Sequence, residues 1–320
     1  MTSLNTKKPK IATLLLFLLV ASLEWQVSAA SAAARSFQIS PPVLEVALAP
    51  GSVQESTITV TNMTDDLVSL EAFVRDFVAG PDGDEPRILG EDETSPFSLK
   101  NWLLSSQKNF VLAAKEEKTV TVTIAVPNGA EPGGHYGLVG FTEPNSEIGE
   151  GVGVKAGIAT LFLVTVEGQL TESGTITRFR GPGLNVSGRV PLALSVKNTG
   201  NVHLVPQGFI RITNLFGNQV AELPVNAEGD LVLPASERAF SSTWAAISAF
   251  GYYRAQATVY FSETGNQAVS PAITIWVFPA RTLAIGILSL VILILLGYEI
   301  EHVLVHRRQP REGLPGQGVP

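Results

Sequence analysis

Alternating apolar and polar residues dominate the chain between its two ends, and this pattern predicts β-strands. The clearest example is residues 118–126 (KTVTVTIAV), where valine and isoleucine alternate with threonine. A period of two residues places one face of a strand in a core. Residues 56–61 and 68–78 show the same pattern, and the continuous apolar run 158–166 predicts a strand that is buried on both faces.

The second half of the chain repeats the pattern of the first. Three pairs of segments correspond in the same order: 58–64 (ITVTNMT) with 194–200 (LSVKNTG), 114–124 (AKEEKTVTVTI) with 235–244 (ASERAFSSTW), and 134–136 (GHY) with 251–253 (GYY). In both segments of the first pair, a strand of alternating pattern ends at an asparagine, which begins a turn. Three matches in one order predict two related β-sandwiches.

The fold class follows from a tyrosine near the start of a late strand in each half. Tyr136 and Tyr252 stand where immunoglobulin-like sandwiches carry a tyrosine corner, in which a phenol closes a loop onto the backbone. We therefore predict an all-β protein with two tandem immunoglobulin-like β-sandwiches, at residues 36–168 and 169–278.

The sequence patterns at both ends of the chain predict targeting segments. Residues 1–34 combine lysines, the apolar run 11–23 and a small-residue stretch (VSAASAAA), which is typical of a secretory signal peptide. Near the other end, the unbroken apolar run 283–298 predicts a single transmembrane helix at residues 279–300.

The flanks of that helix predict its orientation. Trp276 and Tyr298 bracket the run as interfacial aromatic residues, and Arg307 and Arg308 lie in the short tail, residues 301–320. Basic residues stay on the cytoplasmic side, so we expect a single-pass protein of the cell membrane with both sandwiches outside and the tail cytoplasmic.

Charge and cysteine content narrow the chemistry. Residues 36–168 carry 7 Lys+Arg against 19 Asp+Glu, a net charge of −12, whereas residues 169–280 carry 7 against 6. A first domain with this net negative charge repels nucleic acid, so we expect no nucleic-acid partner. The chain has no cysteine, which excludes disulfides, thiolate nucleophiles and cysteine-ligated metals.

An acidic loop is the one candidate metal site. Asp82, Asp84 and Glu85 could offer carboxylate oxygens to calcium, but their spacing fits no EF-hand loop. A solvated acidic loop is the favoured interpretation, and we expect no other cofactor.

Catalytic residues are scarce. The exported part contains only two histidines, His135 and His203, one in each half, and no acid, base and nucleophile cluster can be assembled around them. Trp102, in a predicted short helix at 98–106, is interpreted as a core residue, with a carbohydrate platform as the alternative. We therefore predict that the protein is not an enzyme.

The order of segments resembles that of a known family. The signal peptide is followed by an I-S-P-P strand (39–42), a P-G turn, the T-V-T-N strand, the segment 126–136 (VPNGAEPGGHY), and an I-W-V-F-P run into the last helix. This arrangement is similar to that of the WxL-interacting protein family of bacterial membrane-anchored surface proteins. The resemblance implies cell-wall binding by the first domain and partner binding by the second.

Two functions remain open from the sequence. The first is a non-catalytic, membrane-anchored surface protein that binds cell-wall polymer or exported surface proteins through its sandwiches. The alternative is an assembly or chaperone-like factor that captures exported subunits by β-strand addition, with residues 158–166 and the proline-broken first strand as candidate edges.

Overall fold

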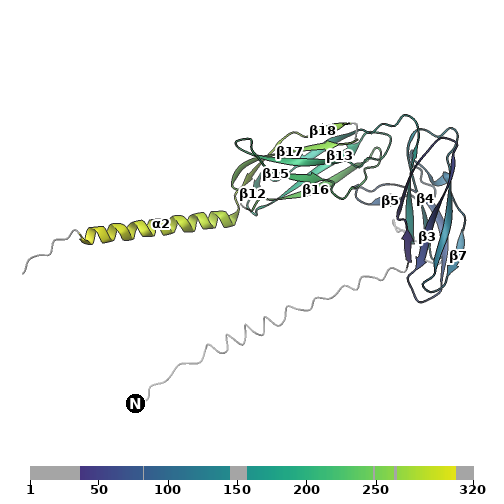
Figure 1. Ribbon diagram of the computed structural model, residues 1–320, viewed down its shortest axis with the longest axis horizontal. Coiled ribbons are helices and arrows are strands. Elements are labelled where there is room, and N and C mark those ends of the chain that lie inside the picture. The colour runs from purple at the N-terminus through teal and green to yellow at the C-terminus, as the bar shows by residue number, and fades with distance from the viewer. Residues whose placement is uncertain (1–36, 82, 145–156, 248, 263–264, 308–320) are drawn as a thin grey trace, which may run out of the picture.

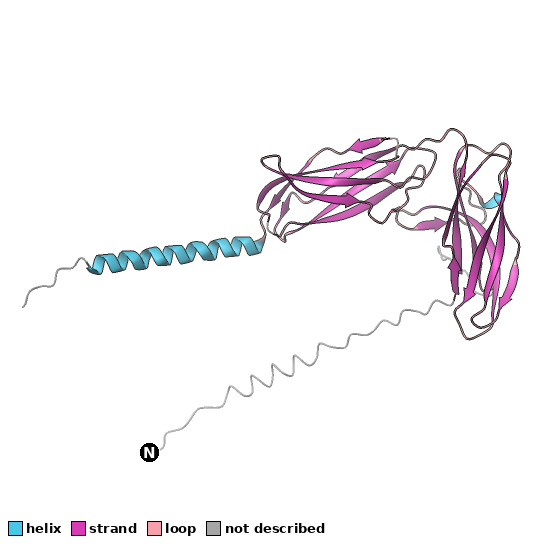
Figure 2. Cartoon of the chain, in the orientation of Figure 1, coloured by secondary structure: helices cyan, strands magenta, loops and turns pink. Residues whose placement is uncertain are grey.

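The computed structural model describes residues 37–307 apart from residues 82, 145–156, 248 and 263–264. The predicted signal peptide therefore lies outside the described residues. The described chain is all-β except for a short 3-10 turn and one C-terminal helix (Figure 2). It forms two sheet-rich domains, each with its own buried core, and in Figure 1 the two domains meet at one end to give an L-shaped outline.

The first domain contains two sheets. One has the strand order β1 (Phe37–Ser40), β3 (Val53–Asn62), β8 (Glu117–Ala125) and β6 (Leu103–Ser105). The other has the order β2 (Val43–Leu48), β10 (Gly157–Val166), β9 (Gly133–Thr142), β4 (Val68–Ala79) and β5 (Pro86–Ile88), with β7 (Asn109–Leu112) also paired to β4. The chain passes from the first sheet to the second at the prolines between β1 and β2, because proline cannot donate to a continuous ladder.

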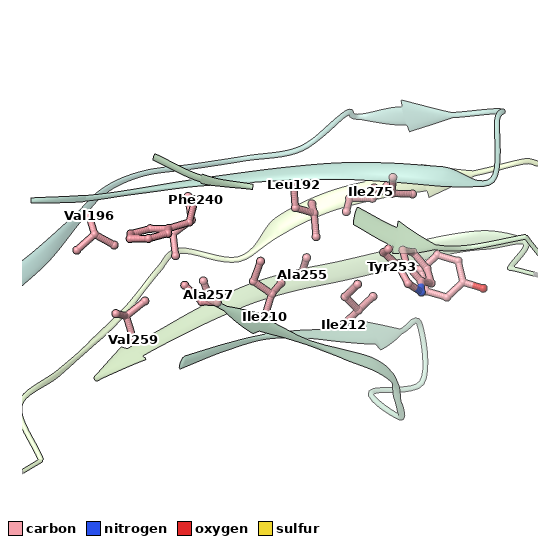
Figure 3. Close-up of a cluster of buried hydrophobic side chains, with 14 of the residues drawn as sticks. Leu192, Val196, Ile210, Ile212, Phe240, Tyr253, Ala255, Ala257, Val259 and Ile275 are labelled. Atoms are coloured by element: carbon pink, nitrogen blue, oxygen red, sulfur yellow. The ribbon is translucent and has the colours of Figure 1, made fainter. Parts of the chain in front are cut away.

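The second domain also contains two sheets. One has the order β11 (Gly174–Arg180), β13 (Arg189–Asn198) and β16 (Glu237–Ala245). The other has the order β12 (Leu184–Asn185), β19 (Ile273–Val277), β17 (Gly251–Tyr260), β14 (Gln207–Asn214) and β15 (Gln219–Val225), with β18 (Gln267–Val269) paired to β17. Figure 3 shows the apolar side chains of both sheets meeting between them, among them Leu192, Ile210 and Phe240.

The predicted repeat has a common hydrogen-bonding basis. Asn62 and Asn198 are both fully buried at the end of a strand. Each side-chain amide donates to the carbonyl four residues ahead and to one distant carbonyl, while each side-chain oxygen accepts an amide two residues ahead. The two asparagines therefore fix equivalent turns in the two domains, as an Asx turn does.

Three local predictions differ from the structure. Tyr136, expected to close a loop onto the backbone, instead has its hydroxyl 3.3 Å from Nδ1 of His203 in the second domain. The helix expected at 98–106 is only the 3-10 turn η1 (Lys100–Trp102), which leads directly into β6. The corner role expected of Tyr252 belongs to Tyr253, whose hydroxyl donates to the carbonyl of Phe250 and accepts its amide, at 3.3 and 3.1 Å. Tyr252 points to the opposite face of β17, where its hydroxyl accepts from Arg254, because successive strand residues face opposite sides.

The C-terminal helix corrects the predicted membrane anchor. Helix α2 (Ala280–Arg307) follows β19 and is tied to the second domain by the amide of Ala280, which donates to Val186. Within the described part of the chain, no helix is both long and apolar enough to cross a membrane.

The residues assigned to that anchor are placed as follows. Trp276 lies on β19 and packs edge-on against Tyr252, while Tyr298 lies within α2. Arg307 is the last residue of α2, and Arg308 lies outside the described residues. The single-pass topology, with its membrane location and cytoplasmic tail, is therefore not supported.

Candidate functional site

The candidate site is the outer face of the β2–β10–β9–β4 sheet, on the side where the second domain meets the first. The strand register places Glu45, Leu163 and Tyr136 in one row across this face. Arg75, Leu138 and Leu161 form the next row. Leu231 and Leu233 of the second domain pack against the cluster that contains Tyr136 and Leu163, so the second domain covers one end of the face.

The part of the face beyond the residues that contact the second domain is apolar at its centre. Phe73, Gly140 and Ala159 share a row, and a Cβ on Gly140 would lie 2.4 Å from the ring of Phe73. The phenyl ring therefore lies across the glycine backbone. Phe73, Gly140 and Ala159 thus form an apolar floor next to the edge of β10.

A chain of three side chains links the domains at the covered end. His203 of the second domain places Nε2 2.8 Å from a carboxylate oxygen of Glu45 and Nδ1 3.3 Å from the hydroxyl of Tyr136. The tautomer with a proton on Nε2 satisfies both contacts, since it donates to Glu45 and accepts from Tyr136. Burial raises the pKa of the Tyr136 phenol, so the hydroxyl keeps its proton and remains a donor.

Further hydrogen bonds hold the same junction. The amide of Gly134 donates to the carbonyl of Asn201 at 2.7 Å, and the side chain of Asn201 donates back to the carbonyl of Pro132 at 3.0 Å. Arg238 of the second domain pairs with Asp230 at 2.9 Å and lies 3.7 Å from Asp84 of the first. These contacts fix the second domain beside the apolar floor.

Tyr136 gives a pH-dependent prediction. Its raised pKa means that the unfolded chain loses this proton first, near pH 10, so the associated stability is present below pH 10 and falls as the pH rises further. Tyr136→Phe loses the bond to His203 and is expected to cost about 1 kcal/mol at pH 7. In denaturant unfolding of both full chains, the difference should shrink at pH 11, and an equal difference at both pH values would contradict this account.

Along one stretch of β10 at this site, no strand of the described chain is hydrogen-bonded to the side that faces β2 further along. β2 pairs with β10 only from Leu161 to Val166, and the amide of Leu161 donates to Pro42 on that side. Backbone groups alternate sides along a strand, so the N–H and C=O groups of Gly157 and Ala159 point to the same side as those of Leu161, beyond the start of β2. The amide and carbonyl groups of these two residues form an open edge, which we call the β10 edge (Gly157–Thr160).

The chain switch between sheets creates this edge. The hydroxyl of Thr160 donates to the carbonyl of Pro41 at 2.7 Å, which marks where the chain leaves β10 for the other sheet. β1 then pairs with β3 and not with β10. The proline-broken first strand predicted from the sequence is thus what uncovers the β10 edge.

The structure does not test the predicted metal residues as a set. Asp82 lies outside the described residues, Asp84 faces Arg238, and Glu85 is exposed. Among the described residues, no three His, Asp or Glu side chains gather closely enough to hold a metal ion. The calcium site stays a prediction.

Trp102 and His135 support the loop beside the apolar floor. Trp102 packs partly buried against the first core, and its ring lies 4.3 Å from that of His135. The two ring nitrogens of His135 lie 3.2 and 3.1 Å from the carbonyls of Ser98 and Glu131. These contacts fit the core interpretation of Trp102.

Sequence reasoning missed Asp76, which is fully buried. Its carboxylate accepts from the hydroxyl of Ser98 and from the amides of Leu99 and Lys100, at 2.6 to 2.8 Å. It therefore caps the turn η1. The available signal was a lone aspartate within the apolar pattern of residues 68–78.

Comparison with known proteins returns no family. No family model and no curated protein matches the chain. Among solved structures, the class 5 fimbriae chaperone CfaA matches at 13% identity and a TM-score of 0.37, over 76% of this chain and 99% of that one. The CupB2 chaperone of Pseudomonas aeruginosa matches at 11% identity and a TM-score of 0.35, over 73% and 98%.

A third match is a complex. The CsuC–CsuE chaperone–tip adhesion subunit pre-assembly complex of Acinetobacter baumannii matches at 15% identity and a TM-score of 0.34, over 64% of this chain and 89% of that one. At this level of identity and TM-score, these similarities carry no functional inference.

The comparisons nevertheless correct the family prediction. The matching structures named above are fimbrial chaperones and not WxL-interacting proteins, and no family model supports that resemblance. The cell-wall role rested on the resemblance, and the surface location rested on the membrane anchor. Both are therefore withdrawn, together with the membrane-anchored surface protein as the function.

Proposed function

We propose that this chain is a non-catalytic assembly factor with two immunoglobulin-like domains that captures exported protein subunits by β-strand addition. The observation that carries the proposal is the β10 edge, where two residues offer backbone donors and acceptors to which no strand of the described residues is hydrogen-bonded. An extended segment of a partner satisfies such groups by adding a strand to the sheet.

The surroundings of the edge define the partner segment. Ala159, Leu161 and Phe73 are only partly buried on the floor beside it, and Val43 on β2 is 43% exposed. A strand that pairs with β10 places alternate side chains over this floor, so apolar residues at every second position suit it. Partners are then exported proteins with an unpaired apolar strand, and no reaction is catalysed.

The solved complex described above contains a chaperone and a tip adhesion subunit. Capture of a subunit by this chain would be an activity of the same kind. Because the TM-scores of the matching structures are low, they do not support the proposal. The proposal rests on the β10 edge alone.

Substitution of Ala159 tests the proposal. Peptides with alternating apolar residues are selected by display on the full-length chain, and their binding to Ala159→Pro is then measured. The amide of Ala159 faces away from β9, so proline removes an outward donor without breaking the β9–β10 ladder. We expect binding to weaken by about tenfold or more, since one hydrogen bond and close strand contact are lost.

Ala159→Ser is the matched control, because it keeps the backbone amide and a small side chain. Selected peptides should bind Ala159→Ser as they bind the wild-type chain. Peptides that bind Ala159→Pro equally well, or a selection that yields no peptide of alternating pattern, would contradict strand capture at β10.

A further inference from the structure

A second open strand edge lies in the second domain, on β16. The amide of Asn198 donates to Ser236 and the amide of Ala246 donates to Gly188, so backbone groups of even-numbered residues face β13. By alternation, those of Ala239, Ser241, Thr243 and Ala245 face outward. No hydrogen bond of the described residues reaches these outward groups.

The β16 edge lacks the protection that other edges of this domain carry. β11 has a bulge between Ile176 and Arg178, β15 contains Pro224, and β12 is two residues long. Bulges, prolines and short strands block edge pairing. β16 instead pairs with β13 over nine residues without a bulge, and residues 239–245 contain no charge and no proline.

Space is available beside this edge. A cavity of about 380 Å³ is lined on one side by residues 239–243 of β16 and on the other by Leu223, Pro224 and the loop that follows β15. At the start of β16 the space closes, because a Cβ on Gly83 would lie 2.3 Å from the carbonyl oxygen of Glu237. The open space therefore borders β16 from Ala239 to Thr243, and the hydroxyl of Ser242 donates to the carbonyl of Pro224 on β15 at 3.1 Å.

The sequence of this stretch is complementary to itself. Antiparallel pairing of residues 239–245 with their own copy puts Ser242 on the twofold axis. Ser241 then faces Thr243 of the other copy, Ala239 faces Ala245, and Phe240 faces Trp244. Ser241 and Thr243 are exposed, and hydroxyl pairs are favourable across antiparallel strands. Phe240 and Trp244 are buried in the core of their own domain and do not contribute to the pairing. No like charges meet.

We propose that two copies of this chain associate through β16, forming one continuous sheet across a twofold axis at Ser242. The occupant of this edge is a second copy because the outward side chains match in that register. The interface does not involve the β10 edge, so either proposal can be wrong without affecting the other.

The absence of cysteine permits a direct test of register. Ser241→Cys and Thr243→Cys are made separately in full-length chains with tags of different size, mixed, and oxidised in non-ionic detergent, which shields the exposed apolar side chains of α2. Directly opposed residues of a hydrogen-bonded pair have Cα atoms about 5.5 Å apart, within the range of a disulfide.

The expected product is the mixed dimer. Each single variant is offset from its own copy by two residues, a diagonal separation of about 7 to 8 Å that disfavours a disulfide. The mixed disulfide should exceed either homodimer by roughly tenfold, with thermal melting unchanged from wild type. No disulfide, or homodimers as abundant as the mixed dimer, would overturn the proposal.

Discussion

A chain carrying Val164→Asp is expected to lose the folded first domain. Val164 lies on β10 with no exposed surface and packs in the first core. An aspartate there has no partner for its charge, and such buried charges cost more than about 4 kcal/mol. Circular dichroism and denaturant unfolding should show that the first domain no longer unfolds cooperatively.

Val43→Asp is the matched control for this experiment. Val43 lies on β2 opposite Leu161, and its side chain is 43% exposed. The same change of residue there should cost less than about 1 kcal/mol. A Val164→Asp chain as stable as Val43→Asp would contradict the placement of β10 in the core.

The expected result distinguishes the core part of β10 from its open edge. From Leu161 to Val166, β10 is paired on both sides, and four of its six residues are buried, so this part is a core strand. Only Gly157 to Thr160 offers an open edge. Tests of capture therefore belong at Ala159 and not at Val164.

Asn198→Ala is expected to destabilise the second domain by about 2 kcal/mol, because it leaves the carbonyl of Val202 and the amide of Gly200 without their partner and removes one of the two donors to Val232. The carbonyls belong to Val202 and Val232, in two different loops. Loss of the asparagine thus releases the turn and the loop before β16 together. Chemical denaturation of the full chain measures the effect.

Asn218→Ala controls for the change of residue type, since Asn218 is exposed and its side chain makes none of these bonds. It should change stability by less than about 0.5 kcal/mol. Equal effects at the two positions would show that the buried asparagine does not hold the loops.

Local patterns predicted the strands well. The alternation in residues 118–126 corresponds to β8, and the matched asparagines of the two halves occupy equivalent buried positions. Both signals are local, because a side chain's exposure along a strand repeats every two residues. The tyrosine corner of the second domain was predicted at Tyr252 but lies at Tyr253. Neighbouring strand residues face opposite sides, so an error of one residue selects the wrong face.

The candidate site depends on contacts that no local pattern contains. His203 meets Glu45 across 158 positions of sequence, and the β10 edge is open only because β2 ends its pairing at Leu161. Strand order and pairing length follow from the packing of the whole domain. The sequence indicated candidate edges, and the structure limits the open one to four residues.

Hydrogen exchange at the amides of Gly157 and Ala159 tests strand capture most directly. The full-length chain is measured alone and saturated with a peptide selected on it. Strand addition predicts that exchange at these two amides slows by about tenfold or more, while the amides of Ile158 and Thr160, which face β9, stay as protected as before. Protection elsewhere on the chain, with no change at Gly157 and Ala159, would contradict capture at the β10 edge.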